Sequence, residues 1–94
     1  MLAEGHDSAS LRFALAARYL ADGNATLAVE HASIAVELDA DYSAAWRLLG
    51  QAQTEVGLLD EAAETYTRGI EAAERRGDQQ VGKEMRVFLR RLKR

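Results

Sequence analysis

The middle of the chain, residues 46–69, reads WRLLGQAQTEVGLLDEAAETYTRG. It divides into two helical segments on either side of Gly57, and glycine readily adopts the left-handed conformation that follows a helix. Asp41 is a candidate N-cap for the helix before this glycine. Asp60 and Glu61 place two acids at the positive N-terminal end of the helix after it. We therefore predict two helices joined by a short turn, over residues 41–56 and 60–76.

The same start and stop signals flank three further segments. Either Asp7 or Ser8 caps a first helix that ends at Gly23, and Asn24 caps a second one. Asp78 caps a last helix near the end of the chain. No segment alternates apolar and polar residues with the period of two that a half-buried strand shows. We therefore predict an all-α antiparallel array, with the three further helices over residues 9–22, 25–38 and 78–92.

The chain also repeats itself. Residues 9–42 align with residues 43–76 at an offset of 34, with identities at Leu15/Leu49, Gly23/Gly57, Ala28/Ala62, Glu30/Glu64 and Glu37/Glu71. A fixed period near 34 residues is the length of a helix–turn–helix repeat. We therefore predict four parts: a short N-terminal segment (1–8), a first repeat (9–42), a second repeat (43–76) and a C-terminal helix (77–94).

The second repeat resembles the tetratricopeptide repeat through Trp46-x-x-Leu49-Gly50, Gly57, Asp60-Glu61-Ala62, Tyr66 and Gly69. The resemblance implies that Gly50 and Ala62 lie where the two helices of the repeat cross. It also implies that Trp46, Leu49 and Tyr66 fill the space around that crossing. The expected fold is an α-solenoid fragment of two such repeats closed by a capping helix, similar to short stand-alone bacterial tetratricopeptide proteins.

The first repeat is a degenerate copy of the same pattern. The residues that fit are Leu15, Ala16, Tyr19, Ala28 and Ala35. Arg12 stands where the family usually has tryptophan, Ala32 where it has an aromatic residue, and Gln53 where the second copy would have tyrosine. The proline that often ends such a repeat is replaced by Ala40 and Glu74. The resemblance is therefore stronger for the second repeat than for the first.

Composition favours one small soluble domain. Hydrophobic residues make up 48% of the 94 residues and charged residues 29%, with a formal net charge of −3. No apolar run approaches the roughly 18 residues of a membrane span, and the N-terminus lacks the features of a signal peptide. We therefore expect a cytoplasmic protein that contacts no membrane. Without cysteine the chain forms no disulfide and no thiolate zinc site.

Charge is distributed unevenly along the chain. Residues 1–77 carry six arginines and no lysine against thirteen acidic residues, a net charge of −7, whereas residues 78–94 carry a net charge of +4. The apolar residues of the last helix, Val81, Met85, Phe88, Leu89 and Leu92, fall on one stripe opposite the basic residues Lys83, Arg86 and Arg90. A solenoid needs a cover with a polar outer side over its last repeat. We therefore expect this helix to be a C-terminal cap.

Residues that could carry catalysis or bind a metal are sparse. His6 and His31 lack the pairing expected of a zinc site, and we expect both on the surface. Asp60 and Glu61 are consecutive on a helix, so they point in different directions. The sequence has no glycine-rich phosphate loop and no GxSxG motif. We therefore expect no enzyme activity, no metal and no cofactor.

The first helix of each tetratricopeptide repeat lines a concave surface. The resemblance therefore implies partner-binding residues at Phe13, Ala17, Leu20, Arg47, Gln51, Thr54 and Glu55. A peptide would set an apolar side chain against Phe13 and Leu20, while Arg47 and Gln51 bind its polar groups. Alternatively, Phe13 and Leu20 belong to the core or are covered by the N-terminal residues. The favoured function is a non-enzymatic scaffold that binds a partner protein or peptide through this face.

Two other functions remain open from the sequence. The first repeat has no evident cover on its N-terminal side, and Leu11 and Phe13 lie near that end, which suggests a self-associating homodimer. The basic residues Lys83, Arg86 and Arg90 suggest instead a helix that binds nucleic acid or another anion. The net charge of −7 on the body opposes a polyanion, and no aromatic residues interleave with the basic ones to stack bases. Nucleic acid is therefore not the expected partner.

Overall fold

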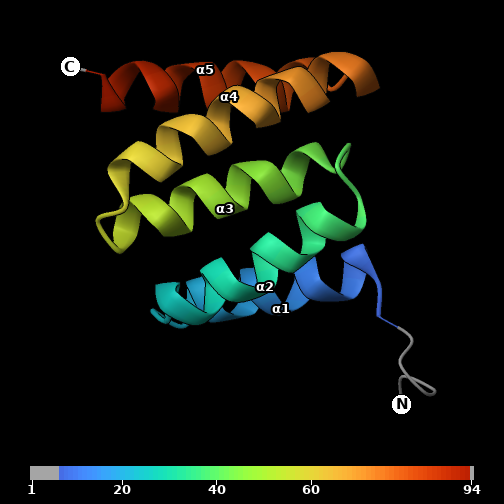
Figure 1. Ribbon diagram of the computed structural model, residues 1–94, viewed down its shortest axis with the longest axis vertical. Helices are drawn as coiled ribbons and strands as arrows, with labels where there is room; N and C mark the ends of the chain where they lie inside the picture. Colours follow the sequence, from blue (N-terminus) through green and yellow to red (C-terminus); the bar gives the residue numbers. More distant parts are fainter. Residues whose placement is uncertain (1–6, 94) are drawn as a thin grey trace.

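Five α-helices and short connections make up the part of the chain that the computed structural model describes, residues 7–93. The helices are α1 (Ala9–Ala21), α2 (Ala25–Leu38), α3 (Ser43–Glu55), α4 (Leu59–Arg76) and α5 (Gln79–Leu92). Figure 1 shows them stacked in chain order, from α1 and α2 at one end to α5 at the other. The stack measures 44 × 29 × 18 Å. The predicted all-α class is confirmed, and each predicted helix is present with ends within two residues of those expected.

Local capping explains where the first two helices begin. The Ser8 side chain accepts a hydrogen bond from the Leu11 N–H at 3.0 Å, and the Asn24 side chain accepts one from the Leu27 N–H at 3.2 Å. Both bonds satisfy N–H groups that lack a partner within the helix. At the end of α4, Gly77 has φ +73°, the left-handed conformation predicted for it.

One predicted N-cap is wrong, and another occupies its predicted position without making a capping hydrogen bond. Tyr42, not Asp41, occupies the N-cap position of α3, and no side chain caps that helix. Asp78 stands at the N-cap position of α5, but its carboxylate caps nothing there. Instead it accepts a hydrogen bond from the Ser43 hydroxyl, 35 residues earlier in the chain. Both aspartates bind residues distant in sequence, so local spacing could not reveal their roles.

The helices alternate between two sides of the array. Consecutive helices pack together, and α3 also approaches α1 and α5, whereas no Cα atoms of α2 and α4 come within 8 Å of each other. Because the odd-numbered helices are closer together than the even-numbered ones, the array curves. Helices α1, α3 and α5 therefore line its inner side, and α2 and α4 lie on its outer side.

The core is built around small residues that let helices approach. Gly50 in α3 lies directly against the ring of Tyr66 in α4, and a Cβ on Gly50 would lie 2.6 Å from the Tyr66 Cζ. Gly69 lies against Trp46 and Met85, where a Cβ would be 2.7 Å from the Trp46 Cβ. Met85 is fully buried, so α5 covers the α4 surface with the apolar stripe that the sequence predicted.

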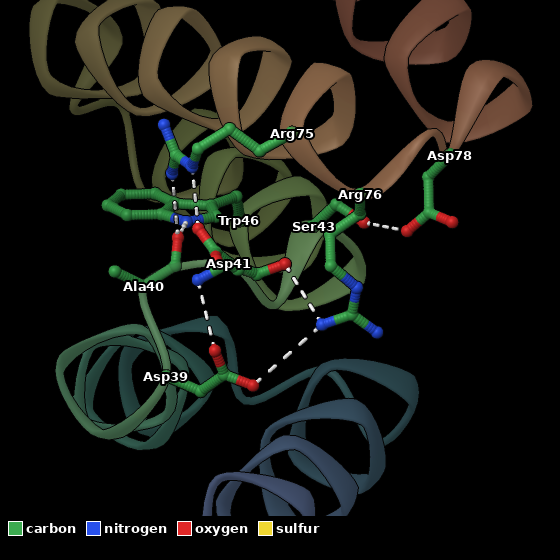
Figure 2. A network of polar contacts seen from close by, with 8 residues as sticks. All are labelled: Asp39, Ala40, Asp41, Ser43, Trp46, Arg75, Arg76 and Asp78. Atoms are coloured by element: carbon green, nitrogen blue, oxygen red, sulfur yellow. Dashed lines mark hydrogen bonds and ion pairs between the residues drawn. The ribbon is translucent and has the colours of Figure 1, made fainter.

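The link between α2 and α3 is fixed to the end of α4 (Figure 2). The Arg75 guanidinium donates to the Asp41 carboxylate at 2.6 Å and reaches the Ala40 carbonyl at 3.4 Å. Arg76 donates to the Asp41 carbonyl at 3.3 Å. The Trp46 indole N–H also donates to the Ala40 carbonyl, at 2.8 Å. These contacts hold the second helix pair in a fixed position against the end of the first.

Candidate partner-binding groove

A hollow of about 360 Å³ lies on the inner side of the array, where the C-terminal ends of α1, α3 and α5 come together. Its lining residues are Leu20 from α1, Gln51, Thr54 and Glu55 from α3, Tyr66 from α4, and Phe88, Arg91 and Leu92 from α5. The three inner helices run parallel to one another because each is separated from the next by one antiparallel helix. Their ends therefore lie at the same level and form one concave site.

Tyr66 and Phe88 form the aromatic part of this hollow. Their ring centroids are 5.6 Å apart with the planes tilted by 43°, within the range that favours aromatic pairs. Burial raises the pKa of the Tyr66 phenol, and a hydrogen bond with Thr54 opposes that rise. The Thr54 hydroxyl donates its proton to the Gly50 carbonyl at 2.8 Å. The hollow therefore has a wall of two packed aromatic rings and a neutral phenol.

The open edge of the hollow carries both signs of charge. Glu55 and Arg91 are exposed and come from different helices, α3 and α5. Gln51 also lines the hollow and offers both a hydrogen-bond donor and an acceptor. Leu20 and Leu92 add apolar surface. This arrangement suits an apolar group flanked by polar ones, as in a peptide side chain with its backbone.

Four of the seven predicted groove residues line this hollow: Leu20, Gln51, Thr54 and Glu55. The other three lie elsewhere. Phe13 packs against Tyr42, with ring centroids 5.1 Å apart, and against the core. Arg47 forms an ion pair with Glu84 of α5. Ala17 is half-buried in α1 outside the hollow.

Sequence reasoning missed the half of the hollow that α5 provides, because that helix was interpreted as a cap with a basic outer side and not as part of the concave surface. A signal for it was present. Phe88 follows Thr54 by 34 residues, as Thr54 follows Leu20, so all three occupy the same position in the repeat. Extending the offset past residue 76 would have placed α5 as a third inner helix.

The basic residues of α5 do not form an unopposed basic surface. Lys83 and Arg90 are exposed, but the Arg86 guanidinium donates to the Glu74 carboxylate of α4 at 2.7 Å. Lys83 and Arg86 also border a hollow of about 370 Å³ whose rim includes the carboxylates of Glu74 and Asp78. This acidic surrounding weakens the attraction that the helix would exert on a polyanion.

Arg12, at a position where the family usually has tryptophan, organises a polar cluster on the first helix pair. It pairs with Asp7 at 2.8 Å, and a second nitrogen lies 2.9 Å from Nδ1 of His31. The His31 ring is half-buried and stacks on Tyr19 at 5.3 Å, so it is less exposed than the sequence suggested. His6 lies outside the described residues.

No group of three or more potential metal ligands occurs within residues 7–93. Within the same range, no helix has the length and hydrophobicity to cross a membrane.

Comparisons with known proteins find close relatives. A protein of Pseudomonas aeruginosa named as TPR repeat-containing is 48% identical to this chain over 94 residues, covering 100% of this chain and 90% of that protein. The crystal structure of a tetratricopeptide repeat domain protein from Salinibacter ruber matches with a TM-score of 0.85 at 30% identity, over 93% of this chain and 97% of that one. The solution structure of a protein from Bordetella parapertussis matches with a TM-score of 0.82 at 42% identity, over 98% of this chain and 80% of that one. A scan against protein-family models finds no match.

Proposed function

This chain belongs to the tetratricopeptide repeat family, whose members are protein–protein interaction modules, and we propose that it binds a peptide segment of a partner protein in the inner hollow. The observation that carries the proposal is that three inner helices contribute to one concave site with an aromatic wall and a polar edge. The role is that of a non-enzymatic scaffold.

The lining suggests how a peptide would be held. An apolar side chain of the peptide contacts Leu20, Phe88 and Leu92, where it removes apolar surface from water. Gln51 binds a backbone amide or carbonyl group of the peptide, and Glu55 and Arg91 select charges on either side of the anchor. Arg47 has a supporting part, because its ion pair with Glu84 holds α3 against α5.

The test compares two double variants in affinity capture from the native cell extract. The first, Leu20→Gln with Arg91→Glu, changes one apolar and one basic residue of the hollow. The control, Ala21→Gln with Lys93→Glu, places glutamine and glutamate at exposed neighbours that do not line the hollow. Both proteins must first show wild-type circular dichroism and thermal unfolding. We expect partners that wild type and the control retain and that the hollow variant loses.

The same partner peptide then allows the site to be mapped. Adding it to isotopically labelled protein should shift the amide resonances of the residues at the C-terminal ends of α1, α3 and α5. Partners that bind the hollow variant as strongly as wild type would contradict the proposal. Shifts confined to α2 or to the outer face of α5 would contradict it as well.

A further inference from the structure

A second hollow, of about 520 Å³, lies on the outer side of the array between α2 and α4. It exists because these two helices do not touch, so that α3 forms a floor between them. Trp46 and Leu49 of α3 give this floor an apolar character, and Val36 of α2 adds to it from one wall, although all three are buried and Trp46 is only 9% exposed. We refer to this hollow as the outer groove.

The walls of the outer groove are acidic. Glu37 projects from α2, and Glu61 and Glu64 project from α4, all three exposed. The cation on this lining is Arg68, which pairs with Glu64 at 3.3 Å. Glu37 and Glu61 form no ion pair with any residue in the described range 7–93. The groove therefore has an apolar floor between two carboxylates that form no ion pair. Such a surface fits a segment in which basic side chains flank an apolar side chain.

The chain itself carries a surface of that kind. The outward side of α5 presents Lys83, Arg86, Val87 and Arg90, which fall at positions i, i+3, i+4 and i+7 of one helical face. All four are exposed. Arg86 pairs with Glu74 of α4 at 2.7 Å, whereas Lys83 and Arg90 form no ion pair with any residue in the described range 7–93. Val87 is 38% exposed, although the apolar stripe of α5 faces the opposite way. We refer to these four residues as the α5 ridge.

The outer groove and the α5 ridge cannot meet within one molecule. The buried Met85 and the partly buried Phe88 and Leu89 hold α5 against the core, with the ridge directed away from it. Contact between the two surfaces therefore requires two molecules. The charges agree with such a contact, because residues 1–77 carry a net charge of −7 and residues 78–94 carry +4.

We propose that the α5 ridge of one molecule docks in the outer groove of a second copy of this chain. Val87 covers the apolar floor beside Trp46, while Lys83 and Arg90 pair with Glu37 and Glu61, in the manner of an amphipathic helix in a groove. Because the two contacting surfaces differ, each docked pair leaves one groove and one ridge free. The contact therefore adds further copies in a chain instead of closing a symmetric dimer. It uses neither the inner hollow nor the N-terminal end.

The test is the mass of the particle in solution, measured by sedimentation and light scattering over a range of protein concentrations. For wild type at about 10 mM salt, we expect the average mass to rise past that of a dimer as concentration increases. At about 1 M salt the charges are screened within a few ångströms, and the mass should fall towards that of the monomer. A wild-type protein that stays monomeric at low salt overturns the proposal.

Charge reversals identify the surfaces. The groove variant Glu37→Lys/Glu61→Lys and the ridge variant Lys83→Glu/Arg90→Glu should each remain monomeric alone, because each then presents like charges on both surfaces. Mixed in equal amounts they should associate again, since every groove then meets a ridge of opposite charge. The control Glu30→Lys/Glu71→Lys makes the same change in net charge on the same helices, at exposed residues outside the groove, and should associate.

The mixing step also guards against misfolding, because recovered association requires two folded proteins. Circular dichroism of each variant gives an independent check. Association of the groove variant alone to the wild-type extent overturns the proposal, as does a mixture of folded variants that stays monomeric. Loss of association in the control variant would also contradict it, since net charge and not the groove would then decide the outcome.

Discussion

At the scale of single residues, the contact between Gly50 and Tyr66 makes a strong prediction. Replacing a glycine by alanine inside an exposed helix usually gains about 1 kcal/mol. At Gly50 the added Cβ would lie 2.6 Å from the Tyr66 Cζ, so the helices must separate or the ring must move. We expect Gly50→Ala to lower the free energy of unfolding by about 1–3 kcal/mol, measured by urea denaturation.

Gly82 provides the matched control for that substitution. It is also a buried helical glycine, but a Cβ there would lie 3.3 Å from the Ala73 Cβ, a contact that a small shift relieves. Gly82→Ala should therefore change the free energy of unfolding by less than about 1 kcal/mol. Equal losses at the two glycines would mean that Tyr66 does not set the distance between α3 and α4.

Trp46 combines packing with a polar contact, and two substitutions separate them. Trp46→Ala removes the indole from the core cluster and should cost about 3–5 kcal/mol in the free energy of unfolding. Trp46→Phe keeps an aromatic ring but removes the donor to the Ala40 carbonyl, so it should cost clearly less. Denaturant titrations give both values. Equal costs for the two variants would contradict a mainly apolar role for this side chain.

Asp7 gives the first helix pair a dependence on pH. The hydrogen bond from the Arg12 guanidinium holds the pKa of the Asp7 carboxyl below its ordinary value. A carboxyl with a lowered pKa in the folded state contributes stability above its ordinary pKa and loses it as the pH falls through the folded value. Thermal melts of wild type and Asp7→Asn should therefore differ at neutral pH, and the difference should shrink below about pH 4. A difference that persists at strongly acidic pH would contradict this account.

At the scale of the elements, the link between α2 and α3 is a tight turn that accepts a proline. The Tyr42 N–H donates to the Asp39 carbonyl at 3.1 Å, which makes Ala40 the second residue of a four-residue turn. Proline is favoured at that position, and the preceding Asp39 is already extended, at φ −147° and ψ 96°. Ala40→Pro should raise the free energy of unfolding by about 0.4–1 kcal/mol through a less flexible unfolded chain.

The measurement for this variant is again denaturant unfolding, and the neighbouring acid provides a contrast. Asp41→Pro would place proline where the backbone N–H donates to the Asp39 carboxylate at 3.0 Å, and it would remove the partner of Arg75. It should therefore destabilise the protein. Stabilisation by both prolines would show that the turn is not formed as described.

The sequence predicts the helices themselves but not the side-chain contacts between them. Helices and their order follow from local signals, namely apolar spacing, Ser8 and Asn24 as caps, and a glycine after α4. The partners of Asp41 and Asp78 could not be predicted in the same way, because Arg75 and Ser43 lie 34 and 35 residues away. The ion pair between Arg47 and Glu84 could not be predicted either, because the two residues come together only when α5 packs against α3. Arg47 was therefore assigned to the groove.

The sequence predicted about half of the residues that line the candidate site. The repeat position brought Leu20, Gln51, Thr54 and Glu55 together, and all four line one hollow, while their role in binding stays a prediction. Phe88 and Arg91 were missed because they lie beyond the two copies that the alignment covered. The outer groove was missed for a different reason. It depends on a separation between α2 and α4 that comes from the curvature of the whole array.

At the scale of the whole molecule, the stacking order predicts where the structure opens first. Helices α3 and α4 have neighbours on both sides along the stack, whereas α1 and α5 each lie at an end of the described array (Figure 1). We expect native-state hydrogen exchange to be slowest for amides of α3 and α4 and faster for those of α1 and the last turn of α5. Equal protection in all five helices would indicate that the array opens only as one unit.

The pair between Asp41 and Arg75 bears on how such a protein could grow by gene duplication. These residues are 34 positions apart, so Arg75 occupies in the second repeat the place that Asp41 occupies in the first. A tandem copy of residues 43–76 would bring its own arginine against Arg75, two guanidinium groups where an ion pair now stands. In a protein lengthened in this way, the two arginines would repel each other where the repeats meet. One of them would have to be mutated to an acidic residue to restore the ion pair. The link that fixes two repeats together thus works against simple lengthening of the array.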